Sequence, residues 1–318
     1  MISEIENALK IHDETVADSG LSIWIGSEPT FTLHTSEEPQ WTSQALGGDK
    51  KSYAMRIVEK LNQRHPGSLV LRTVGRQYSG EDLPRWSFGI YERRDKQAVW
   101  NGPPDPMLVT TKDSDKGKLA AFIAAIKLKL IECHWHYKGL VPANSDAEAR
   151  LLIYFDENDI PNLAESDPRL SRGSVHDEKT PETGLHDSLA EEGFFLVVIR
   201  EVTDEADISS INVELPAFKP VNRFLQFLEV LNMSANEAGL NTLQLTGYPP
   251  PIDQFISWTT VTPDPAVIEI NQAPEPGISG FYAANRELFE IASSLGLSSY
   301  RLHYNGSSSD AGLSLIHI

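Results

Sequence analysis

The sequence predicts an α+β fold in which helices pack on a largely antiparallel sheet. Segments with helical periodicity are interleaved with short runs rich in β-branched and aromatic residues, without a strict alternation of strand and helix. The runs at 69–73 and 85–91 are too close in sequence for a crossover helix, so we expect these two strands to be antiparallel. A chain of 318 residues can bury a substantial core.

Four segments have apolar residues at helical spacing, and we predict that they form the helices. In the first, Tyr53, Ile57 and Leu61 lie on one face. Gly239 follows the third and is a typical helix stop. The predicted helices span residues 49–64, 116–133, 221–238 and 281–295.

Nine short runs are typical of strands because they are rich in Val, Ile, Leu and aromatic residues. They span residues 21–25, 69–73, 85–91, 151–155, 194–199, 211–215, 242–245, 267–271 and 300–303. The segment from Asn158 to Glu192 is instead rich in Asp, Glu, Ser, Pro and Gly and has no periodic apolar stripe, which predicts a mobile surface insertion. We find no internal repeat, so we expect one domain with an insertion.

Composition excludes some classes of partner. The formal charge of −18 argues against nucleic acid and anionic membranes, because both attract cationic surfaces. No apolar run approaches the length of a membrane span, and the N-terminus has neither the basic nor the hydrophobic region of a signal peptide. The single cysteine, Cys133, suits a reducing compartment. We therefore expect a cytoplasmic protein.

Two acidic segments predict a cation site. Glu269 and Asn271 are two residues apart in a predicted strand, so both side chains leave the same face. A carboxylate beside an amide oxygen suits Mg²⁺, although the solvated face of an edge strand would look the same. Glu28 precedes Pro29 at the end of another predicted strand, where the backbone is held extended. If the two strands share a sheet, Glu28 and Glu269 could converge on the cation; the alternative for Glu28 is a surface turn.

Two further segments carry groups that could bind ligands. Arg76 and Arg85 lie in a glycine-containing turn between strands, and a guanidinium can clamp phosphate or carboxylate oxygens in bidentate fashion. Surface ion pairs are the ordinary alternative for such arginines. The run from Cys133 to His136 contains a thiol and two imidazoles but no second ligand pair nearby, so we expect it to be structural.

Read together, these segments resemble the DUF2126 family of bacterial amidoligases, which is usually found C-terminal to a transglutaminase-like domain. The matching blocks keep their order from roughly residue 10 to residue 312. They are Ile25-Gly-Ser-Glu28-Pro-Thr-Phe31, Trp41-Thr-Ser-Gln-Ala-Leu-Gly47, Tyr78-Ser-Gly80-Glu81 with Leu83-Pro-Arg-Trp86, Gly247-Tyr-Pro-Pro-Pro251, and Thr262-Pro-Asp-Pro265 with Val267-Ile-Glu-Ile-Asn271.

The resemblance implies a glutamine-synthetase-like carboxylate–amine ligase fold and ATP- and Mg²⁺-dependent formation of an amide or peptide-like bond. The implied mechanism transfers the γ-phosphate to a substrate carboxylate, after which an amine attacks the acyl phosphate. Glu28 and Glu269 map onto strand positions of metal-binding glutamates, with Asn271 as a third oxygen ligand. Arg76 stands where the family usually has lysine and Arg85 is retained, so both are predicted contacts of phosphate or substrate carboxylate. Glutamine-synthetase-like enzymes often assemble, which makes a homo-oligomer compatible with the resemblance.

The ends of the chain depart from the family pattern. No transglutaminase-like domain precedes the first block, and the family continues beyond Gly312 with a glycine-rich turn and a histidine. We therefore expect residues 1–312 to be an incomplete amidoligase-like domain. The last six residues, 313–318, are what one frame of a common transposon mosaic-end adapter encodes, so we expect a non-native read-through tail and give His317 no catalytic role.

Two rival interpretations stay open. An ATP-grasp ligase also places a Glu-x-Asn pair on a metal-binding strand, but it needs lysines on upstream strands, and none of the predicted strands contains one. A catalytically silent binding or scaffold module is the second rival. Neither interpretation identifies the acid or the amine.

Overall fold

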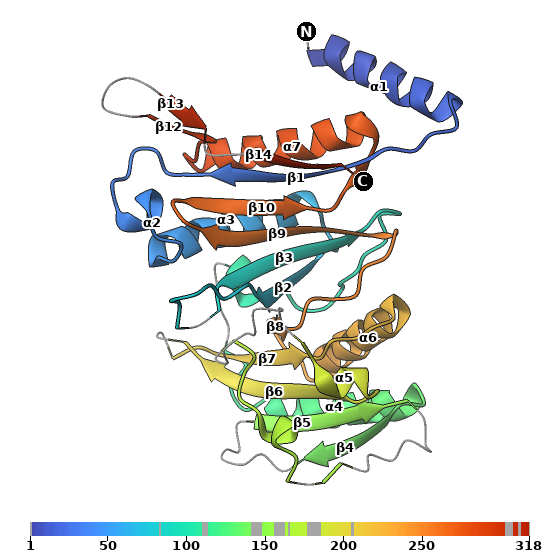
Figure 1. Ribbon diagram of the computed structural model, residues 1–318. Coiled ribbons are helices and arrows are strands. Elements are labelled where there is room, and N and C mark those ends of the chain that lie inside the picture. The colour runs from blue at the N-terminus through green and yellow to red at the C-terminus, as the bar shows by residue number, and fades with distance from the viewer. Residues whose placement is uncertain are drawn as a thin grey trace. The chain divides into compact units, whose positions relative to one another are not determined.

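The computed structural model describes residues 2–82, 84–109, 114–140, 148–155, 163–164, 166–176, 186–204, 207–302, 308–310 and 313–317 (Figure 1). The chain forms two compact units. The first comprises Met1–His65, Ser87–Ile90 and Ser257–Ile318, and the second comprises Pro66–Trp86 and Tyr91–Ile256. The fold is α+β with mostly antiparallel strand pairing, which confirms the predicted class. The predicted domain of residues 1–312 draws on both units, and its limits stay a prediction.

The first unit is built on antiparallel strands. Strand β1 (Trp24–Phe31) pairs on one side with β10 (Val267–Gln272) and β11 (Glu275–Pro276), and β10 pairs in turn with β9 (Ile256–Asp264). Strand β14 (Leu313–His317) also pairs with β1 and places Ser314 opposite Glu28. That pairing does not test whether residues 313–318 are native, so the tail stays a prediction. A separate ribbon joins β12 (Tyr300–Leu302) to β13 (Ser308–Asp310).

Helix α7 (Gly277–Ser294) packs on β1 and supplies one wall of the core of the first unit (Figure 1). Phe31 of β1 meets Phe289 of α7 edge-on, with ring centroids 5.2 Å apart. The other helices of this unit are α1 (Ile2–Asp18), α2 (Pro39–Thr42) and α3 (Gly48–Arg64). Buried side chains from α3, α7 and the strands include Ile57, Val58, Leu61, Ile268, Ile270, Leu288 and Ile291.

The second unit has a mixed sheet in the order β2-β8-β7-β6-β5-β4. Pairing is parallel between β2 and β8 and between β7 and β8, and antiparallel elsewhere. The strands are β2 (Leu69–Val74), β4 (His136–Leu140), β5 (Glu148–Tyr154), β6 (Phe195–Thr203), β7 (Ser209–Leu215) and β8 (Leu243–Gly247). Strand β3 (Trp86–Arg93) has residues in both units. Helices α4 (Leu119–Glu132) and α6 (Val221–Glu237) pack against one another.

The described parts of the segment from Asn158 to Glu192 pack onto the second unit. Leu170 and Leu189 are buried in a cluster with Leu152, Leu196 and Val198 of the sheet. This segment contains a 3₁₀ turn (Pro168–Ser171) and a short helix, α5 (Ser188–Glu191). These contacts are made by single apolar residues rather than by a periodic stripe, so no local pattern predicts them.

The four predicted helices correspond to α3, α4, α6 and α7, and all nine predicted strands have a counterpart. Helix α1 and strand β9 are not among the predicted elements. The prolines of Thr262-Pro-Asp-Pro265 suggest a turn there, but Pro263 lies inside β9 opposite Ile268. The turn comes one step later, at Pro265 and Ala266, and Ala266 adopts a positive φ of 66°.

Candidate functional site

Glu28, Glu269 and Asn271 lie on one face of two neighbouring strands. Thr30 of β1 is directly opposite Glu269 of β10. Directly opposed residues point to the same side of a sheet, and residues two apart on a strand share a face. Glu28 therefore shares its face with both β10 side chains, so the condition that these two strands belong to one sheet is met.

This face of the first unit is open to ligands. Glu28, Thr30, Glu269 and Asn271 are all partly exposed, whereas the alternating residues Phe31, Ile268 and Ile270 are buried. The strict alternation shows that one side of β1 and β10 faces the core and the other is accessible. Polar groups on the accessible side can reach a ligand without unfolding any part of the core.

Strand β9 extends the open face with residues that the sequence did not indicate. Thr262 lies opposite Glu269, and Thr260 lies opposite Asn271. Both threonines are partly exposed, and Val261 between them is buried. The apparent turn at 262–265 hid this strand; the run of β-branched and aromatic residues from 256 to 262 is the signal that could have revealed it.

A hydrogen bond couples the two β10 groups. Asn271 Nδ2 donates to Glu269 Oε1 over 2.8 Å. The bond uses one carboxylate oxygen and the amide nitrogen, so Glu269 Oε2 and the amide oxygen of Asn271 remain as acceptors. The pair therefore presents two oxygens that a hard cation could accept as ligands.

The oxygen ligands on this face suit a cation that is also coordinated by water or phosphate oxygens. In the part of the chain that the structure describes, no group of three or more His, Cys, Asp or Glu is placed to hold a metal. Glu28 and Glu269 supply only two carboxylates, and Asn271 supplies an amide. Mg²⁺ commonly binds through one or two carboxylates together with waters and phosphate oxygens, so these residues fit it.

The opposite face of the same strands carries a polar contact that fixes the register. The Ser27 hydroxyl, which is 2% exposed, lies 2.8 Å from Gln272 Oε1 and 3.1 Å from Asn285 Oδ1 of α7. A slip of one residue between β1 and β10 would turn Glu28 towards the core. Ser27 and Gln272 therefore help to hold the carboxylates on the open side.

Arg85 is held by contacts within its own turn in the second unit. Its guanidinium donates to Glu81 Oε1 from Nε at 2.9 Å and from Nη2 at 2.8 Å, and it stacks over the Tyr78 ring at 4.0 Å. Arg85 is also 7% exposed. These contacts close the turn between Gly75 and Trp86, so a phosphate would have to compete with Glu81 for this guanidinium.

Arg76 differs from Arg85 in being exposed. Its carbonyl accepts the Arg85 N–H at 3.1 Å, so the backbone is fixed while the side chain projects from the turn. Both arginines belong to the second unit, whereas Glu28, Glu269 and Asn271 belong to the first. Their contact with the same ligand stays a prediction.

Comparison with protein families bears directly on this arrangement. The chain matches the family described as "Putative amidoligase enzyme (DUF2126)" over residues 2–166 and 175–314. The chain belongs to the DUF2126 family. Neither a comparison with curated proteins nor one with solved structures finds a match.

One DUF2126 block, Trp41 to Gly47, supports the hairpin that carries Glu269. Lys50 at the start of α3 is fully buried, and its ammonium donates to the carbonyls of Gln44 at 3.0 Å, Ala45 at 3.0 Å and Asp264 at 2.8 Å. Asp264 ends β9, so this lysine ties the block to the β9–β10 hairpin. The conspicuous tryptophan of the block, Trp41, is buried beside it, and Trp41 Nε1 donates to Asp49 at 3.1 Å.

The Cys133–His136 run of this DUF2126 chain serves packing. Trp135 is buried between Phe155 and Phe227, with ring centroids 4.7 and 6.2 Å away. His136 begins β4 and stacks on Tyr154. These contacts agree with the structural role predicted for the run.

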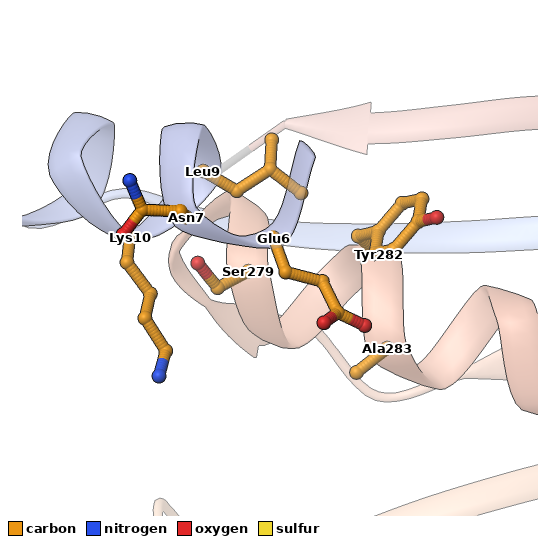
Figure 2. A pocket seen from close by; sticks show the side chains of 7 residues that line it. All are labelled: Glu6, Asn7, Leu9, Lys10, Ser279, Tyr282 and Ala283. Carbon is orange, nitrogen blue, oxygen red and sulfur yellow. The ribbon is translucent and has the colours of Figure 1, made fainter. Parts of the chain in front are cut away.

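A pocket of about 450 Å³ lies between α1 and α7 of the DUF2126 chain (Figure 2). Lys10 and Tyr282 lie at opposite ends of it, and Glu6 between them is paired with Arg286. The pocket is on the helix side of β1, not on the face that carries Glu28. The one carboxylate among the described residues that line it, Glu6, is held by Arg286, so we do not assign the active site to it.

No helix among the described residues combines the length and the apolar character needed to cross a bilayer.

Proposed function

We propose that this DUF2126 protein is an ATP- and Mg²⁺-dependent carboxylate–amine ligase that works through an acyl phosphate. The observation that carries the proposal is the gathering of Glu28, Glu269 and Asn271 on the open face of β1 and β10. Membership of a family described as amidoligases supports the reaction class. The substrates would be a small-molecule or peptide carboxylate and an amine.

The three side chains have distinct roles in this proposal. Glu28 and Glu269 hold Mg²⁺ from neighbouring strands, and the hydrogen bond from Asn271 orients Glu269. When bound, the cation neutralises the charge on phosphate oxygens, which is the main demand of phosphoryl transfer. Thr260 offers a hydroxyl donor to the same oxygens from β9, whereas the Thr262 hydroxyl donates to the Glu269 carbonyl at 3.5 Å.

The chemistry proceeds in two balanced steps. A carboxylate oxygen of the acid attacks the γ-phosphorus, the bond to the β-phosphate oxygen breaks, and ADP leaves. The amine nitrogen then attacks the acyl carbon, phosphate leaves with the carbon–oxygen bond electrons, and the nitrogen loses a proton. The open face suits these two steps, because the acid must reach the γ-phosphate of ATP from solvent and the amine must then reach the acyl phosphate.

Arg76 is the better of the two predicted phosphate or carboxylate contacts. Its side chain is exposed, whereas Arg85 is paired with Glu81. We expect Arg76→Ala to weaken nucleotide or acid binding and Arg85→Ala to act mainly through loss of the turn. Thermal unfolding of the two variants separates these effects, since only Arg85→Ala should lower the melting temperature clearly.

Calorimetric titration with ATP, in the presence and absence of Mg²⁺, tests the proposal. We expect Mg²⁺-dependent binding that Glu269→Ala and Glu28→Ala each weaken by about tenfold or more, a loss of 1.4 kcal/mol or more. Glu14→Ala is the matched control, because Glu14 is an exposed carboxylate on α1, outside the strand face.

Equal binding by the wild type and Glu269→Ala would refute the metal assignment. Binding without any amide product from a panel of acids and amines would instead favour the scaffold interpretation. ADP release that depends on both an acid and an amine is the direct sign of ligase activity. The ATP-grasp interpretation predicts the same products, so the two ligase classes differ only in fold.

A further inference from the structure

We propose that Trp258 binds the base of the nucleotide by stacking, and that β9 thereby sets the ligand's direction across the open face. This inference rests on the proposed function, because it assigns the non-phosphate part of the same ligand. No part of it depends on Arg76 or Arg85.

The register places Trp258 on the face that carries Glu269 and Asn271. Thr262 is opposite Glu269 and Thr260 is opposite Asn271, so the even-numbered residues of β9 share that face. The pairing continues to Trp258, whose carbonyl accepts the Ala273 N–H at 2.8 Å. Trp258 is thus the next residue along the same side of the strand.

Burial along β9 agrees with this placement. Three of the four residues on the other face, Ser257, Val261 and Pro263, are buried, and the fourth, Thr259, is partly exposed. On the open face Trp258, Thr260 and Thr262 are all partly exposed. Trp258 is a partly exposed aromatic residue beside polar groups and so is a candidate for stacking, whereas Trp41 in the core of the same unit is fully buried.

The spacing suits a ligand with phosphates at one end and a flat ring at the other. Trp258 is four residues along β9 from Thr262, which is about 14 Å at about 3.4 Å per residue. Glu269 lies opposite Thr262, and Asn271 lies between the two ends. A nucleoside triphosphate held through its cation at Glu269 can extend along β9 and reach the Trp258 ring with its base.

Stacking also explains how an acidic protein could bind an anion here. The open face carries Glu28 and Glu269, and the chain has a formal charge of −18, so this face repels a nucleotide unless a cation is bound. An aromatic platform adds affinity that does not depend on charge. Stacking of a base on an aromatic side chain commonly changes affinity by about tenfold when it is removed.

Two ligands distinguish the contribution of the base to binding from that of the phosphates. They are Mg²⁺-ATP and Mg²⁺ with inorganic triphosphate, each titrated by calorimetry. We expect Trp258→Ala to weaken ATP binding about tenfold or more and to leave triphosphate binding within about twofold of the wild type. Trp258→Phe should retain most of the ATP affinity, because it keeps an aromatic face. Glu269→Ala should weaken both ligands.

Thr259→Ala is the matched control, since Thr259 is adjacent on β9 but points to the opposite face. It should leave the affinities for both ligands unchanged. Circular dichroism and the melting temperature verify that each variant is folded. If Trp258→Ala does not fold, Trp258→Phe still tests the stacking role. ATP should quench tryptophan fluorescence in the wild type and quench it less in this variant.

The outcomes distinguish the two proposals. If the wild type binds triphosphate with Mg²⁺ and Trp258→Ala weakens neither ligand, or both equally, the stacking role is wrong and the metal site stands. If the wild type binds neither ligand, the proposed function fails and the role of Trp258 falls with it. A selective loss of ATP binding supports both.

Discussion

Asn271 donates a 2.8 Å hydrogen bond from its side-chain amide to Glu269, two residues away on the same face of β10. The bond holds a carboxylate and an amide oxygen side by side where solvent can reach them. We predict that Asn271→Asp will lower the melting temperature without Mg²⁺, because it replaces the bond by repulsion between two carboxylates. The same change should enlarge the stabilisation that Mg²⁺ produces, since the added charge strengthens cation binding.

Differential scanning fluorimetry with and without Mg²⁺ measures both effects. Asn7→Asp, which adds the same charge on exposed α1, is the control and should leave the Mg²⁺ response unchanged. A Mg²⁺ response identical in Asn271→Asp and the wild type would show that no cation binds between Glu269 and Asn271.

Lys50 provides a test of how the hairpin behind the site is supported. Its buried ammonium donates to three backbone carbonyls, of Gln44, Ala45 and Asp264. We predict that Lys50→Met, which keeps the length of the side chain, will destabilise the protein by about 3 kcal/mol because buried carbonyls lose a charged donor. Urea unfolding measures the loss, with Lys51→Met at the exposed neighbour as the control. Similar unfolding midpoints for the two variants would contradict this account.

Glu214 organises a buried charge network in the second unit. Its carboxylate accepts from Arg172 Nη1 at 2.5 Å, Ser174 Oγ at 2.9 Å and Arg200 Nη1 at 3.2 Å, and the residue is fully buried. Arg172 and Ser174 belong to the segment predicted as a mobile insertion, so Glu214 ties that segment to β7. We predict that Glu214→Gln will destabilise the protein by about 3 kcal/mol, because it removes the carboxylate that pairs with Arg172 and leaves Arg200 with Glu148 as its remaining carboxylate partner. Urea unfolding at pH 7 measures the difference from the wild type.

The same group predicts a loss of stability in acid. Burial alone would raise the Glu214 pKa, but Arg172, together with the charge of Arg200 and the hydrogen bond from Ser174, outweighs it and holds the pKa below its ordinary value. A lowered carboxyl pKa stabilises the fold above the unfolded value of about 4.3, and the contribution disappears as the pH falls through the folded pKa. We therefore expect the gap between the wild type and Glu214→Gln to narrow below about pH 4.3. A gap that stays constant down to pH 3 would show that the charge of Glu214 contributes little.

Local pattern was sufficient to predict only part of this site. The alternation around Glu269 and Asn271 correctly predicted a shared face, because a strand of period two fixes it. The extent of β9, and with it Thr260 and Trp258, was hidden by Pro263, which sits in the strand opposite Ile268.

Partners distant in sequence could not be predicted at all. Glu214 meets Arg172 across 42 positions, and Lys50 meets Asp264 across 214. The sequence marks such charges as surface residues, since burial of a charge depends on contacts that only the folded chain creates. Arg85 shows the opposite case: its partner Glu81 is four residues away, but only the folded turn shows that the Arg85 side of the pair is buried.

Gly247, in another DUF2126 block, occupies a position that only glycine can fill. It ends β8 between Thr73 of β2 and Leu215 of β7, with a φ of 112°. A Cβ there would lie 2.4 Å from the Leu215 carbonyl oxygen, so both the backbone conformation and the neighbouring strand oppose a side chain. We predict that Gly247→Ala will destabilise the protein by about 3 kcal/mol.

Gly239 is the matched control for Gly247. It also has a positive φ, 65°, but nothing lies within 4 Å of the Cβ that alanine would add. Gly239→Ala should therefore cost only about 1 kcal/mol, the strain of the left-handed conformation itself. The difference between the two variants in urea unfolding isolates the steric conflict with β7 from backbone strain. Equal losses of stability in the two variants would show that strand β7 can shift to accommodate the added methyl group. Close packing at the ends of these parallel strands would then not be the reason for glycine at position 247.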